Sequence, residues 1–101
     1  MRLNGDLDQA SIDSLKRRSI DIIDKYYIRN IVFNLEKVSF MDSSGIGYII
    51  GRYTQVKNRR GRIIVCSMNS LIERIFNLSG LKRICSIVEN EEQATKLLEA
   101  A

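Results

Sequence analysis

The sequence predicts an α/β domain with a mostly parallel sheet, and two observations support this. Short runs of β-branched and aromatic residues alternate along the chain with longer segments whose apolar residues recur at helical spacing. Strands that are separated by helices are normally joined as parallel neighbours through right-handed crossovers. The length of 101 residues allows one modest hydrophobic core. We therefore expect one domain over residues 1–101, with a single sheet and alternating helices.

Two helices and one strand are predicted in the first half of the chain. The first helix is expected from Asp8 to Tyr27, with Asp8 as its N-cap. Residues 31–35 predict a strand buried on both faces. Residues 36–42 are expected to form a connector, and Gly61 is expected to end the second helix. The apolar residues at helical spacing are Ile12, Leu15, Ile22, Ile23 and Tyr26 in the first helix, and Ile46, Ile49, Ile50, Tyr53 and Val56 in the second.

The second half of the chain continues the alternation. Residues 63–66 predict another buried strand, and Ser70 with Glu73 matches a capping box at the start of the third helix. Gly80 is expected to end that helix, because glycine adopts the left-handed conformation easily. Residues 84–88 predict a last strand, and Asn90 is expected to cap the final helix. The apolar residues of these two helices are Leu71, Ile72, Ile75 and Phe76, and then Ala94, Leu97 and Leu98.

The absence of histidine argues against an enzyme. Without histidine the chain has no Ser-His-Asp or Cys-His arrangement, which nearly excludes a small hydrolase, and it has few possible zinc ligands. The glycines near residue 45 lack the spacing of a dinucleotide fingerprint. Asp6 and Asp8 alone offer too few oxygen ligands for a hard cation. We expect no catalytic residue, no cofactor and no metal.

The charge distribution does not indicate nucleic-acid binding. The net charge is +4, and a cluster of cations lies where the second helix should end, as the helix macrodipole favours. No nucleic-acid-binding motif accompanies these cations. No apolar stretch has the length of a signal peptide or a membrane span, so the cytoplasm is the expected compartment and no membrane is expected as a partner. Cys66 and Cys85 are then expected to be reduced core residues.

The most informative segment is residues 39–47, Ser-Phe-Met-Asp-Ser-Ser-Gly-Ile-Gly. It places two hydroxyls at the predicted start of a helix, where free backbone N–H groups form an anion site. A plain N-cap is one interpretation, because serine is common at that position. A functional serine is the other. Gly47 and Gly51 are one helical turn apart and predict close packing of this helix on a neighbouring element.

These residues resemble the STAS-type anti-anti-sigma factors, and within them the branch of the stage II sporulation protein AA type, the anti-sigma F factor antagonists. The similar segments are residues 3–8, 31–35, 39–47, 51–53, 65–66 and 76–81. The resemblance implies an unphosphorylated form that binds an anti-sigma factor, itself a serine kinase, and thereby releases the sporulation sigma factor. It also implies phosphorylation of Ser43 by that kinase and its reversal by a PP2C-like phosphatase.

The resemblance also implies a docking surface around the phosphorylated serine. We expect Ser44 to be the better-placed cap and Gly45 to leave room for the kinase. The expected partner-binding residues are Asp6, Asp8, Met41, Asp42, Ser44, Gly45, Ile46 and Ile49. Two alternatives stay open: a STAS-like module that senses a nucleotide or lipid without phosphorylation, and an antagonist in the general stress response.

The start of the chain differs from the pattern of this family. Members usually have two strands before the first helix, whereas this sequence begins at Met1 with at most the tail of the second. We therefore expect an N-terminal strand to be missing, which leaves an open sheet edge. Such edges recruit other strands, so self-association through the N-terminal edge is expected.

Overall fold

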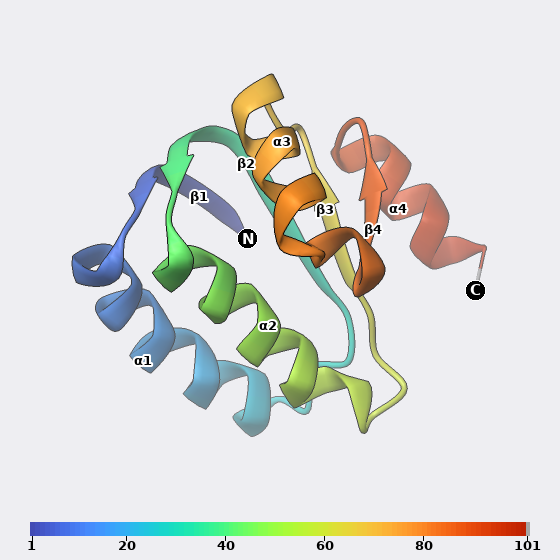
Figure 1. Ribbon diagram of the computed structural model, residues 1–101. Helices are drawn as coiled ribbons and strands as arrows, with labels where there is room; N and C mark the ends of the chain where they lie inside the picture. The colour runs from blue at the N-terminus through green and yellow to red at the C-terminus, as the bar shows by residue number, and fades with distance from the viewer. Residues whose placement is uncertain (101) are drawn as a thin grey trace.

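Four strands and four α-helices alternate along residues 1–100, the part of the chain described by this computed structural model (Figure 1). One short 3₁₀ helix, η1, precedes the last strand. The elements in chain order are β1 Arg2–Leu7, α1 Gln9–Lys25, β2 Ile31–Met41, α2 Ser43–Lys57, β3 Ile63–Cys66, α3 Ser70–Ser79, η1 Leu81–Arg83, β4 Cys85–Val88 and α4 Glu91–Glu99.

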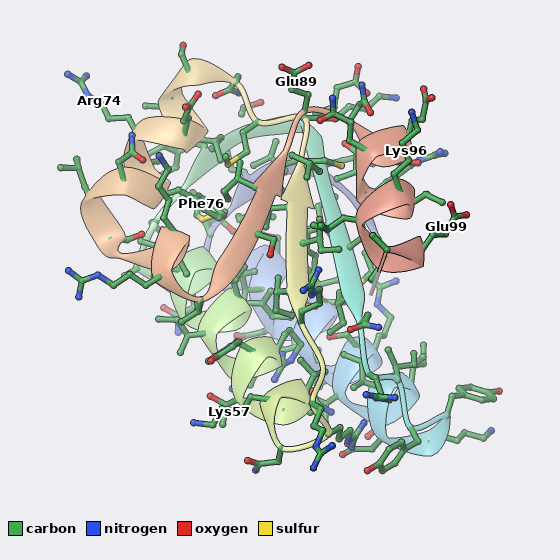
Figure 2. All side chains as sticks on the ribbon, turned by 90° about the vertical axis from the view of Figure 1, so that its right-hand side faces the viewer. Lys57, Arg74, Phe76, Glu89, Lys96 and Glu99 are labelled. Atoms are coloured by element: carbon green, nitrogen blue, oxygen red, sulfur yellow. The ribbon has the colours of Figure 1, made fainter. Side chains whose placement is uncertain are left out.

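The strands form one fully parallel sheet in the order β1-β2-β3-β4, which confirms the predicted α/β class. Helices α2 and α3 cover one face of this sheet and α4 covers the other (Figure 2), while α1 lies beside α2 (Figure 1). Each connection leads from one strand to the next strand in the sheet, always towards β4. Because such crossovers are right-handed, the connecting helices α1, α2 and α3 lie on the same face of the sheet, and α4 covers the opposite face.

The core lies between the sheet and α1, α2 and α3. All four residues of β3 are buried, as the predicted apolar run requires. Phe33 of β2, Ile49 of α2 and Phe76 of α3 are fully buried in this core, and Phe76 is labelled in Figure 2. Both cysteines are free and buried, as expected. Among residues 1–100, no helix is long and apolar enough to cross a membrane.

The expected connector at residues 36–42 is wrong, because β2 continues to Met41. Its second half pairs with β1, a strand that local sequence does not place beside it. The register shifts between Gly5 and Asp6, where Gly5 has a φ of 77°. Such a bulge bends the strand and increases its twist. The pairing of Leu7 with Met41 beyond this bulge brings the carboxyl ends of β1 and β2 together.

Several predicted helix boundaries and core positions need correction. Ile22 and Tyr26 in the first helical segment are 51% and 66% exposed and do not belong to the core. Ile50 and Leu71 are 44% and 45% exposed. Helix α2 ends at Lys57, before Gly61.

Gly61 instead allows a close approach of two chain segments, because a Cβ there would lie 1.7 Å from the Arg29 carbonyl oxygen. The cap of α3 is Asn69 rather than Ser70, since its side chain accepts a hydrogen bond from the Ile72 N–H. Gly80 in the left-handed conformation and Asn90 as the α4 cap are confirmed.

Candidate functional site

Ser43 is the first residue of α2 and is exposed at the carboxyl edge of the sheet. The starts of α1 and α2 lie side by side at this edge (Figure 1), because each helix follows directly on one of the paired strands β1 and β2. The Asp42 N–H donates to the Leu7 carbonyl over 3.4 Å and joins the two turns. The structure thus brings Asp6 and Asp8 next to the segment that contains Ser43.

Aspartates, not serines, cap the two helices at this edge. Asp42 Oδ1 accepts a hydrogen bond from the Ser44 N–H at 2.8 Å, so the expectation that Ser44 caps α2 is wrong. Asp8 Oδ1 accepts from the Ser11 N–H at 3.1 Å, as predicted for the α1 cap. Hydrogen bonds from the backbone and hydroxyl of Ser11 lower the pKa of Asp8. Because Asp42 fills the capping role, the exposed Ser43 is not needed as a cap.

The expected docking residues divide into a surface group and a supporting group. Asp6 and Asp8 are exposed, while Asp42, Ser44 and Ile46 are half-buried. The supporting group, Met41, Gly45 and Ile49, is buried beneath them.

The buried position of Gly45 has a structural reason that the sequence did not reveal. A Cβ there would lie 2.6 Å from Met41 Cγ and 2.9 Å from Leu7 Cβ. Such distances are too short for packed carbon atoms, so the start of α2 can reach the strand ends only without a side chain at this position. The space beside residue 45 is therefore taken up by Met41 and Leu7 of this chain. The expectation that this glycine leaves room for a kinase has no support from this packing.

An open groove of about 470 Å³ runs from the serines along the contact between α1 and α2. It is lined by Gln9, Ile12, Asp13 and Lys16 of α1, and by Ser43, Ser44, Gly47, Tyr48, Gly51 and Arg52 of α2. A Cβ at Gly47 or Gly51 would meet nothing within 4 Å, so the predicted close packing of these glycines is wrong. Sequence reasoning did not find this groove, although two glycines inside a helix are a signal that could have indicated it.

No cluster of three or more potential metal ligands occurs among the described residues. The groups at the edge are carboxylates of Asp6, Asp8 and Asp42, two hydroxyls, and helix starts already capped by side chains. This arrangement offers an exposed hydroxyl that can accept a phosphoryl group from another protein. It offers no histidine that could act as a general base.

Comparisons with known proteins agree with this geometry. The family model described as STAS domain matches residues 1–94. The chain is similar to an anti-sigma F factor antagonist of Paenibacillus polymyxa, with 36% identity over 98% of this chain and 85% of the relative. A second one, of Lysinibacillus sphaericus, is 33% identical over 80% of this chain and 69% of the relative. An anti-sigma-B factor antagonist of Staphylococcus aureus is 27% identical over 91% and 84%.

Two solved structures of the anti-sigma factor antagonist SpoIIAA are also similar. The unphosphorylated form has a TM-score of 0.86 and 29% identity, and it covers 99% of this chain and 86% of that chain. The phosphorylated form, from Bacillus, has a TM-score of 0.73 and 29% identity over 95% and 86%. The fold described here therefore occurs in a protein whose structure is known in both phosphorylation states.

Proposed function

The chain belongs to the STAS domain family, and we infer that it is an anti-sigma factor antagonist whose unphosphorylated form binds an anti-sigma factor and frees a sigma factor. The observation that carries this inference is the exposed Ser43 at the first residue of α2, beside an aspartate that already caps the helix. The names of the relatives, anti-sigma F and anti-sigma-B factor antagonists, support the same role. A regulator of this kind needs no catalytic group of its own.

Phosphorylation of Ser43 is the proposed switch. A phosphoserine adds about −1.5 to −2 charges, and at a helix N-terminus it is tolerated or mildly stabilising. The fold should therefore persist after modification. The new charge joins the carboxylates of Asp6, Asp8 and Asp42 at the same edge, so its effect falls on a protein docked there. The proposed donor is the anti-sigma factor acting as a serine kinase, and a PP2C-like phosphatase removes the phosphate in the cytoplasm.

The proposed docking surface combines the turn before α1 with the start of α2. Asp6, Asp8, Asp42, Ser44 and Ile46 would contact the partner, because they are exposed or half-buried around Ser43. Met41, Gly45 and Ile49 would act from beneath by fixing the position of the α2 N-terminus. The single STAS domain would carry the whole function.

The test is phosphorylation by the cognate anti-sigma factor with ATP, followed by mass spectrometry. We expect one phosphate on Ser43. Ser43→Ala should bind the anti-sigma factor persistently, whereas Ser43→Asp should bind it poorly. Ser39→Ala is a matched control, because it removes another exposed hydroxyl outside the proposed docking surface and should still accept one phosphate. A phosphate found on Ser44 or Ser39 would contradict the assignment.

The sigma factor that is released is a separate question. The two anti-sigma F factor antagonists are 36% and 33% identical to this chain, and the anti-sigma-B factor antagonist is 27% identical. This order favours the sporulation sigma factor over the stress-response factor. Competition with purified anti-sigma F and anti-sigma-B factors, each loaded with its sigma factor, would distinguish the two.

A further inference from the structure

The groove between α1 and α2 is continuous with Ser43 and is not explained by the packing of this chain. It begins at Ser43 and Ser44 and extends along α2 to Arg52. Gly47 and Gly51 lie between these ends with open space over them. Each glycine costs about 1 kcal/mol relative to alanine inside a helix. Because no internal neighbour needs the space, the two glycines keep the groove open and accessible from outside.

Arg52 lines this groove and is a charged residue that lacks a full set of partners. It is only 4% exposed. Its Nε donates to Gln55 Oε1 at 3.0 Å, and its guanidinium lies 4.9 Å from the centre of the Tyr48 ring. Its buried Nη1 has no hydrogen-bond partner among residues 1–100. A buried N–H group of a cation without an acceptor is costly, and native structures rarely keep one without a reason.

The residues around Arg52 fix its position. Tyr48 donates its hydroxyl hydrogen to Ser19 Oγ at 2.8 Å, and Gln55 Nε2 donates to the Ile20 carbonyl at 3.2 Å. These bonds connect α2 to α1 on both sides of the guanidinium. Burial raises the pKa of Tyr48, so this hydroxyl stays neutral. The network holds Arg52 at the groove, while the N–H groups of its buried Nη1 find no acceptor among residues 1–100.

The charges of the groove favour an anionic group. Lys16 and Arg52 are its cations, and Asp13 is its one carboxylate. We propose that the groove receives a segment of the anti-sigma factor that carries a carboxylate, which pairs with Arg52 and Lys16 while the segment packs over Gly47 and Gly51. This inference rests on the proposed function. A protein partner fits better than a free anion, because the groove is open along its length and joins the surface around Ser43.

The decisive variant is Gly51→Leu. A leucine there fills the groove with a side chain that meets no atom of this chain at its Cβ, and it suits a helix better than glycine. The variant should therefore fold and melt a few degrees higher than the wild type. Its Kd for the anti-sigma factor should rise at least about tenfold, which corresponds to the loss of one well-packed interface contact. Thr54→Leu is the matched control, because it adds the same side chain to an exposed position of α2 outside the groove.

A second pair of variants tests the charge. Lys16→Glu should weaken binding about tenfold at low salt, and less at high salt. Arg17→Glu is its control, since it makes the same change on an exposed position of α1 that does not line the groove. If Gly51→Leu and Lys16→Glu bind like the wild type, the groove is empty in the complex and the proposal is overturned.

Two other outcomes would also decide the matter. Titration of the free chain with pyrophosphate, followed by ¹⁵N NMR, should leave the signals of Gly47 and Gly51 unchanged. Saturable shifts of these signals would assign the groove to a small anion and overturn the docking proposal. If the wild type itself neither binds the anti-sigma factor nor is phosphorylated by it, the proposed function fails and this inference fails with it.

Discussion

Replacement of two glycines of α2 by alanine should have opposite effects on stability, although they are only two residues apart. At Gly45 a Cβ would lie 2.6 Å from Met41 Cγ, 2.9 Å from Leu7 Cβ and 3.0 Å from the Leu7 carbonyl oxygen. At Gly47 a Cβ would meet nothing within 4 Å. Two of the three contacts at Gly45 belong to the backbone or Cβ of a buried strand residue, which cannot move aside as a flexible side-chain end could.

The size of the difference follows from these contacts. Both substitutions exchange glycine for alanine in the same helix, which favours the helix by about 1 kcal/mol in each variant. Gly47→Ala should keep this gain. Gly45→Ala should also incur the cost of overpacking, about 1 to 3 kcal/mol. The two variants should therefore differ in unfolding free energy by about 1 to 3 kcal/mol, and 1 kcal/mol is worth about 4 to 8 °C in Tm for a domain of 60–100 residues.

Urea unfolding followed by far-ultraviolet circular dichroism measures this difference directly, with Tm from thermal scans as a second measurement. We expect the order Gly47→Ala, wild type, Gly45→Ala from most to least stable. Equal stability of the two variants would refute the packing argument. If Gly45→Ala were stable but bound the anti-sigma factor poorly, the space at this residue would serve the kinase, as the sequence alone suggested.

Three further predictions concern other parts of the chain. Hydrogen bonds from Arg2 and Asn34 lower the pKa of Glu91 to about 2. The ionised Glu91 should therefore stabilise the fold fully above the ordinary pKa of 4.5, and this stabilisation should be lost as the pH falls towards 2. The urea midpoints of Glu91→Gln should lack this pH dependence. Asp6→Lys should weaken association with the anti-sigma factor at low salt, and unchanged binding in calorimetry would remove this residue from the interface. Burial raises the pKa of Cys85 to about 12, so a thiol-reactive disulfide reagent at pH 8 should modify this cysteine only when the chain unfolds. Rapid modification of Cys85 in the native chain would contradict its burial.

The sequence by itself determined the elements whose causes are local. Buried runs such as residues 63–66 are apolar on both faces, and only a central parallel strand or a buried helix accommodates that pattern. Asp8, Asn90 and Gly80 act within one turn of their own position, so their capping roles could be predicted from their neighbours. The segment around Ser43 was likewise recognisable because its residues are contiguous.

The tertiary structure decided what depends on contacts between distant segments. Residues 36–41 form a strand because β1, more than thirty positions earlier, pairs with them across the sheet. Gly45 and Gly47 are indistinguishable by local sequence, yet only Gly45 faces the ends of two strands. Nη1 of Arg52 has no hydrogen-bond partner in the described part of the chain because α1 packs beside α2 and buries the guanidinium without supplying an acceptor for this nitrogen. Local patterns carry no information on such neighbours, since packing brings them together only after the sheet has formed.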